Sequence, residues 1–182
     1  MSDEQTIEVM VEGETLKGIE FIPVPRGHTA REIVVAVAEK GGFPAEEAIL
    51  LVEDCGEPLD LAIVVTDDMA RKKHHVHRVR EIAVVVFYKN LEKEKRFPPS
   101  ARVQCVLDWA VGKDGFNLDP ILAPEMELAR HDKIPDAHEL PKTAHIGRYV
   151  QHEGHHHHHR LALDLIRGVL PQGANDDSRW TC

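Results

Sequence analysis

Residues 6–12 alternate between apolar and polar side chains, which predicts a half-buried strand. A turn at Gly13 and a second strand at residues 16–24 complete a hairpin. Thr29 and Glu32 then match a capping box, so we expect a helix to begin here. The apolar residues that follow fall at helical spacing and form one face: Ala30, Ile33, Val34, Val37 and Ala38.

Three further features complete this first unit. Gly41 and Gly42 end the helix, and the apolar run at residues 49–52 predicts a short buried strand. A turn-rich loop leads to a last strand at about residues 74–79. The basic residues around this last strand indicate an exposed strand with its approach loop. The predicted order is strand, strand, helix, strand, loop, strand.

The same order returns in the second half of the chain. Residues 81–88 have strong β propensity, and residues 92–97 predict the return strand of a hairpin. Ser100 is a candidate N-cap for the helix that follows. Further strands are predicted at residues 125–129 and 161–166. The apolar stripe of the second helix consists of Val103, Val106, Leu107, Ala110 and Val111.

The two halves match in order and in spacing. Their period is about 70–75 residues, which is too long for a solenoid repeat and suits two small domains in tandem. We therefore expect domains at residues 1–80 and 81–168, followed by a flexible C-terminal tail at residues 169–182. The alternative is a single α+β domain of mixed topology.

The β-grasp order consists of a hairpin, one helix packed across it and further strands. Because this order occurs twice in tandem, the chain resembles the ubiquitin-like proteins. A tyrosine-bearing turn at residues 146–154, a strand that alternates leucine with polar residues at 161–167, and then Gly168 are similar to the end of ubiquitin. The fused pair resembles the interferon-induced two-domain modifier of vertebrates and the modifiers of bacterial antiphage conjugation operons. The resemblance implies an α+β fold with two consecutive β-grasp domains.

The same resemblance implies a function. Such modifiers are activated at a C-terminal glycine by an E1-like enzyme, passed to an E2-like enzyme and joined to target proteins by an isopeptide bond, here in antiviral defence. This chain has no Gly-Gly end, so Gly173 is the candidate for the joining residue, with Gly168 as the alternative. A JAB-type peptidase would first remove residues 174–182. The partners would read the tail through Leu170, Pro171 and Gln172.

Composition narrows the classes of partner. The net charge of −9, with acidic and basic residues interspersed, argues against nucleic acid, because phosphate binding needs a basic face. The three cysteines have no paired spacing, which indicates a reducing compartment. No apolar run approaches the roughly 18 residues of a membrane span, and the N-terminus is acidic and polar rather than signal-like. We expect a cytoplasmic protein without a membrane or nucleic-acid partner.

Histidines supply the remaining candidate chemistry. The run that contains His155, His157 and His159 could bind transition metals adventitiously, but no cysteine lies nearby, so we expect no dedicated metal and no cofactor. His75 and His77 share one face of their predicted strand and could make half of a metal site. We interpret them instead as partly solvated strand residues, which is the more common situation for such histidines.

The sequence contains no nucleophile elbow and no phosphate-binding glycine loop, so we expect that the chain is not an enzyme. Two alternatives to the modifier stay open. The first is a β-grasp adaptor or scaffold that binds partners through its sheet faces and never uses its terminus. The second is a small redox or metal-handling protein built around the histidines.

Overall fold

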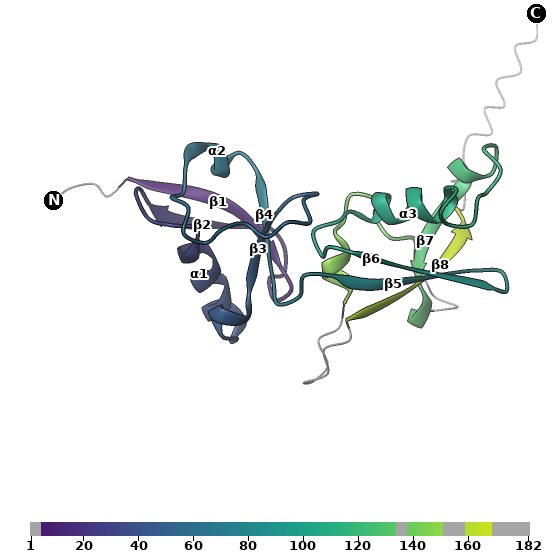
Figure 1. Ribbon diagram of the computed structural model, residues 1–182, viewed down its shortest axis with the longest axis horizontal. Helices are drawn as coiled ribbons and strands as arrows, with labels where there is room; N and C mark the ends of the chain where they lie inside the picture. Colours follow the sequence, from purple (N-terminus) through teal and green to yellow (C-terminus); the bar gives the residue numbers. More distant parts are fainter. Residues whose placement is uncertain (1–4, 134–137, 151–158, 169–182) are drawn as a thin grey trace, which may run out of the picture.

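The computed structural model describes residues 5–133, 138–150 and 159–168, which form two domains side by side along the long axis (Figure 1). The first domain contains, in chain order, β1 (Thr6–Gly13), β2 (Glu20–Pro25), α1 (Arg31–Gly41), η1 (Ala45–Glu47), β3 (Ile49–Val52), α2 (Asp67–Ala70) and β4 (Lys73–His77). The second contains β5 (Ile82–Tyr88), β6 (Leu91–Phe97), α3 (Val103–Val111), η2 (Ala123–Glu125), β7 (Met126–Arg130), η3 (His131–Lys133), η4 (Ile146–Tyr149) and β8 (Arg160–Arg167).

Both sheets have the same topology. β1 pairs antiparallel with β2 and parallel with β4, and β4 pairs antiparallel with β3, which gives the order β2-β1-β4-β3. The second sheet repeats these directions in the order β6-β5-β8-β7. The first and last strands of each unit therefore lie together in the middle of its sheet, which is the β-grasp arrangement. The predicted α+β fold of two consecutive β-grasp domains is confirmed.

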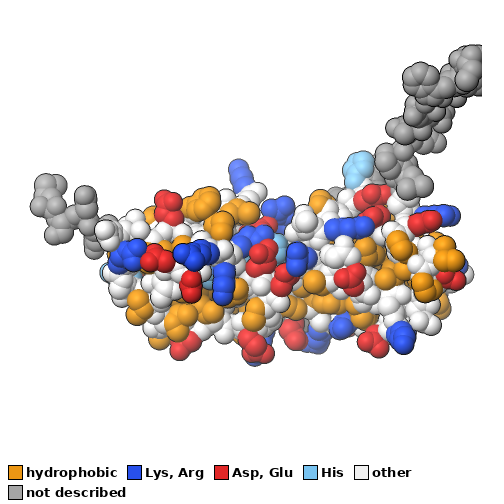
Figure 2. Space-filling model, turned by 90° about the horizontal axis from the view of Figure 1, so that it is seen from above, with side chains coloured by type: hydrophobic (Ala, Val, Ile, Leu, Met, Phe, Trp, Pro, Cys, Tyr) orange, Lys and Arg blue, Asp and Glu red, His pale blue; other side chains and the backbone are white. Residues whose placement is uncertain are grey.

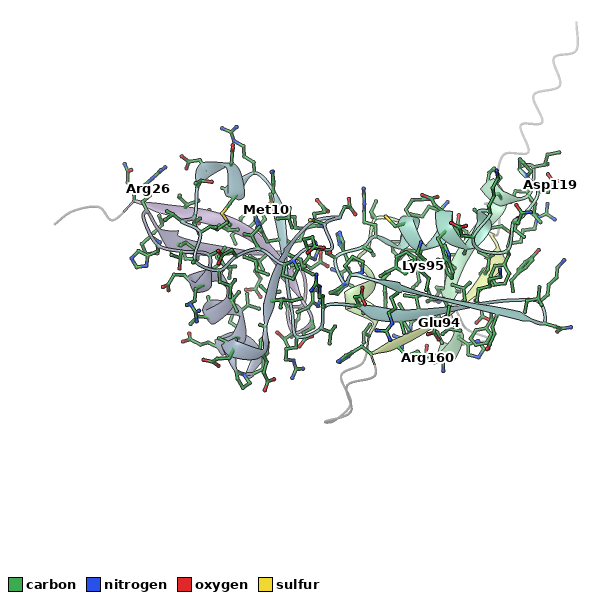
Figure 3. The ribbon with its side chains drawn as sticks, viewed as in Figure 1. Met10, Arg26, Glu94, Lys95, Asp119 and Arg160 are labelled. Atoms are coloured by element: carbon green, nitrogen blue, oxygen red, sulfur yellow. The ribbon has the colours of Figure 1, made fainter. Side chains whose placement is uncertain are left out.

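Each sheet packs one face against one helix. The buried face of α1 consists of Ile33, Val34, Val37 and Ala38. The buried face of α3 consists of Val103, Val106, Leu107 and Ala110. Both sets lie within the stripes that the helical spacing predicts, and each contributes to the apolar core of its own domain. Lys95 on β6 lies against α3, with its Nζ 5.9 Å from the centre of the Trp109 ring (Figure 3).

The predicted start of α1 needs a correction. The helix is preceded by Ala30 as its N-cap, and no described side chain caps its first turn, so Thr29 and Glu32 do not form a capping box. The Thr29 backbone instead forms a β-bridge with Val64 in the loop between β3 and α2. The bridge takes Thr29 out of the capping position, so a tertiary contact overrides the local signal.

The predicted exposure of the basic strand is wrong. β4 is a central strand between β1 and β3, and its residues His74, His75 and His77 are buried. Basic composition suggested solvation, but the parallel pairing of β4 with β1 places the strand inside the sheet.

Figure 2 shows acidic and basic side chains mixed over the visible face of the molecule. None of the helices in the described part of the chain is both long enough and apolar enough to span a membrane.

Candidate functional site

The predicted reactive end of the chain begins where β8 leaves the second sheet. β8 runs away from the first domain (Figure 1), and Gly168 is the residue that follows it in the chain. The backbone N–H of Gly168 donates to the carbonyl of Glu125 at 2.8 Å. A Cβ at Gly168 would lie 2.9 Å from Cγ of Glu127. Gly168 is therefore fitted into the edge of the domain, and its backbone is engaged there.

The remaining tail residues of the sequence prediction lie outside the described residues: Leu170, Pro171, Gln172 and Gly173. His155 and His157 of the histidine run also lie outside the described residues, whereas His159 immediately precedes β8 and its carbonyl accepts from the backbone N–H of Ala83 at 2.9 Å. The domain limits at residues 1–80, 81–168 and 169–182 stay predictions.

A second candidate site is a group of buried polar side chains where the two domains meet. In Figure 3 this junction lies in the middle of the molecule, between Arg26 near one end and Asp119 near the other. Glu12 on β1 lies beside His75 on β4, and His145 precedes η4 of the second domain. Glu12 is 6% exposed, His75 0% and His145 2%. One ligand atom from each side chain lies within 4.8 Å of the other two. The site therefore joins residues from both domains.

Charged groups hold Glu12 in this junction. Lys73 Nζ lies 3.5 Å from Glu12 Oε2, and Arg148 Nη2 lies 2.8 Å from Glu12 Oε1. His145 Nδ1 lies 3.3 Å from Glu12 Oε2, and its Nε2 lies 3.3 Å from Glu53 Oε1. The hydrogen bond with His145 is the main cause that lowers the pKa of Glu12 to about 2; burial opposes this shift, and the nearby positive charges support it. Glu12 is therefore ionised at neutral pH.

His75 carries the least satisfied polar group of the junction. Within the described part of the chain, both of its ring nitrogens are buried and neither has a hydrogen-bond partner. Burial, followed by the charges of His145 and His77, lowers the pKa of His75 to about 3. The ring is therefore neutral at neutral pH, and one of its nitrogens offers an unshared lone pair.

The structure revises the prediction for the strand histidines. His75 and His77 do share a face, with ring centroids 6.2 Å apart and planes at 12°, but both are buried rather than partly solvated. The group of three includes His75 and not His77. Sequence reasoning missed Glu12 and His145. The parallel pairing of first and last strands could have placed Glu12 beside His75, whereas nothing in the sequence pattern points to His145.

Two polar contacts beside this group also join the domains. Ser100, predicted as the N-cap of α3, lies three residues before the helix, and its Oγ donates to the carbonyl of Cys55 at 3.0 Å. The Ser100 prediction is therefore wrong, because this contact draws the side chain to the other domain. Arg102 Nε donates to Asp54 Oδ1 at 3.0 Å.

Two β-grasp units in one chain define a tandem ubiquitin-like architecture. Residues 83–168 match the family model described as BilA ubiquitin-like domain 2. The match covers the second domain, which is therefore similar to this ubiquitin-like family, and it agrees with the position of the domain as the second of two. The predicted resemblance to the tandem ubiquitin-like proteins of bacterial antiphage systems is confirmed. A search of curated proteins found no match.

Proposed function

We propose that this protein is a ubiquitin-like modifier that is trimmed to Gly173 and joined to target proteins. The match of residues 83–168 to a ubiquitin-like domain is the observation that carries the proposal. An E1-like partner adenylates the Gly173 carboxylate, an E2-like partner receives it as a thioester, and an amine of the target displaces the thiol to form an isopeptide bond. The chemistry belongs to these partners, and the chain itself is not an enzyme.

Gly173 is the better of the two glycines. The backbone N–H of Gly168 is engaged by Glu125, so the use of Gly168 would first require its release from the domain. Gly173 lies five residues further along the chain, which reach at most about 17 Å when fully extended. A glycine suits a narrow active-site channel because it has no Cβ, and Pro171 favours an extended approach. Leu170 and Gln172 supply side chains for the partners to read.

Use of Gly173 requires the removal of residues 174–182 by a JAB-type peptidase. The resemblance to antiphage conjugation proteins supports a role in bacterial antiviral defence, in the cytoplasm. Expression together with the neighbouring genes tests the modifier proposal. Loss of nine C-terminal residues by intact mass, together with higher-mass adducts, supports it. A persistent Cys182 terminus without adducts contradicts it and favours the adaptor.

Two truncated chains test the choice of glycine. A chain that ends at Gly173 should form adducts without the peptidase, and a chain that ends at Gly168 should not. In the full chain, Gly173→Val should abolish adducts, whereas Gly168→Val should retain them, with circular dichroism as the check on folding. Adducts from the chain that ends at Gly168, or from Gly173→Val, would show that Gly173 is not the joining residue.

A further inference from the structure

We propose that Glu12, His75 and His145 form a zinc site that joins the two domains. The first two residues lie on neighbouring strands of the first sheet, and the third comes from the second domain. The inference concerns the junction between the domains, and it does not rest on conjugation at the C-terminus.

The unpartnered ring of His75 is the first argument. Nearly all buried polar groups in native proteins have a hydrogen-bond partner, so a buried imidazole without one requires an explanation such as a missing ion. The neighbouring His74 provides the contrast, because its Nδ1 lies 3.0 Å from the carbonyl of Lys72. His75 has no such contact, and its ring packs beside that of His145, with the centroids 4.2 Å apart and the planes at 52°. An ion bound through one nitrogen of each ring would satisfy it.

The chemistry of the donors indicates which ligand. Two imidazoles and one carboxylate form a donor set that proteins use for Zn²⁺, with a water in the fourth position. Mg²⁺ and Ca²⁺ take oxygen ligands, so the two ring nitrogens disfavour them.

The geometry requires only a small contraction. The three ligand atoms lie within 4.8 Å of one another, whereas zinc bonds of about 2.1 Å at tetrahedral angles place ligand atoms about 3.4 Å apart. Rotation of the Glu12 side chain supplies part of this movement. His145 Nδ1 lies 3.3 Å from Glu12 Oε2 and its Nε2 lies 3.3 Å from Glu53 Oε1, although Nε2 has no hydrogen-bond partner among the described residues. Coordination through Nδ1 and a small rotation of the partly exposed Glu53 side chain would let Nε2–H donate to Glu53. This gives the carboxylate–histidine–metal order that orients ligands in zinc sites.

Lys73 is the cationic group with which a metal ion would compete at this site. Its Nζ lies 3.5 Å from both Glu12 Oε2 and His145 Nδ1. A divalent ion displaces this ammonium by like-charge repulsion. Lys73 can follow Glu53, whose Oε1 is 3.1 Å away and which is itself partly exposed. Arg148 stays on Glu12 Oε1 and leaves Oε2 for the ion.

Zinc binding by the purified full-length chain tests the site. Because the run at residues 155–159 and His152 could bind zinc on their own, these histidines are replaced by serine in the reference chain. We expect this reference chain to hold one Zn²⁺ through dialysis, measured by elemental analysis. We also expect Co²⁺ at one equivalent to give the intense visible bands of a tetrahedral site.

Variants in the same reference chain identify the ligands. His75→Gln and Glu12→Gln should each weaken zinc binding more than about 100-fold. Glu53 only supports the ligand His145, so Glu53→Gln should weaken zinc binding by about 10–100-fold. His74→Gln is the matched control, because His74 is a buried histidine on the same strand and should leave the affinity unchanged. Equal affinity in His75→Gln and His74→Gln contradicts the site. If His75→Gln fails to fold, the cobalt spectrum of the reference chain decides, and the absence of tetrahedral bands overturns the proposal.

Discussion

The close approach of Gly147 to the first domain allows a direct test of how the two domains dock. In Gly147→Ala, the added Cβ would lie 2.5 Å from Cε1 of His77 and 2.9 Å from both Cβ and the carbonyl oxygen of Pro99. Ordinary carbon contacts are 3.4–4 Å, so the domains or the side chains must separate by about 1 Å. His77 is buried in β4 and cannot turn into solvent without leaving the sheet face.

Overpacking of this kind costs about 1–3 kcal/mol of the free energy of unfolding. For domains of this size, 1 kcal/mol lowers the unfolding midpoint by about 4–8 °C. We therefore expect Gly147→Ala to unfold at least about 4 °C below the parent, measured by circular dichroism. Gly18→Ala is the matched control, because a Cβ there meets nothing within 4 Å, and this variant should keep or slightly raise the midpoint.

The reasoning would be refuted if Gly147→Ala unfolded at the same temperature as the parent and Gly18→Ala. That result would mean that His77 of the first domain does not lie against Gly147 in solution, and hence that the domains are not docked as described; Pro99 belongs to the same domain as Gly147, so its contact does not test the docking. Small-angle X-ray scattering, which measures the radius of gyration, provides a second test of the docking. Relief of the clash by separation of the domains would raise the radius of gyration of Gly147→Ala alone.

Three further substitutions test the core, the junction and the metal. Leu163→Ala should lower the free energy of unfolding, measured by urea denaturation, by about 2–5 kcal/mol, because Leu163 is 0% exposed. Leu91 is 62% exposed, so Leu91→Ala should change the free energy of unfolding by less than about 0.5 kcal/mol. Equal effects of the two substitutions would contradict the assigned core. Ser100→Ala should cost about 1 kcal/mol in the same assay, because the bond to the Cys55 carbonyl is lost, and an unchanged midpoint would remove that bond from the docking contacts. Lys73→Met should tighten zinc binding several-fold in competition with a chelator, because the ammonium no longer competes for Glu12; weaker binding would argue that Lys73 supports the junction rather than competing with an ion.

Local pattern was sufficient to predict most of the fold. Both hairpins, both main helices and the final strand follow from the local pattern, because these elements bury one regular face in their own domain, with the exception of β6, in which only Phe97 is buried. The failures occur where a distant segment intervenes. Thr29 pairs with Val64 and Ser100 bonds to Cys55, so neither side chain caps the helix that its sequence position suggests.

The junction could not be predicted for a related physical reason. Glu12 occupies a position that strand alternation assigns to solvent, yet it is buried, with His145 and Arg148 of the second domain in contact with its carboxylate. His145 lies in an irregular segment, so no period fixes its direction. The burial of both residues depends on how the two domains pack. That packing involves contacts between residues about 130 positions apart in the chain, such as Glu12 and His145, and a local sequence pattern does not encode such contacts.

The junction and the carboxyl end of β8 lie at opposite ends of the second domain, and this separates the consequences of the two proposals. His145 contacts Glu12 of the first domain, whereas the carboxyl end of β8 points away from that domain (Figure 1). A zinc ion at the junction restrains the relative position of the domains without touching the carboxyl end of β8. His75→Gln should therefore lose zinc and still be trimmed and conjugated, whereas Gly173→Val should lose conjugation and still bind zinc. Loss of both properties in His75→Gln would instead show that the partners recognise the docked pair of domains rather than the second domain and its tail.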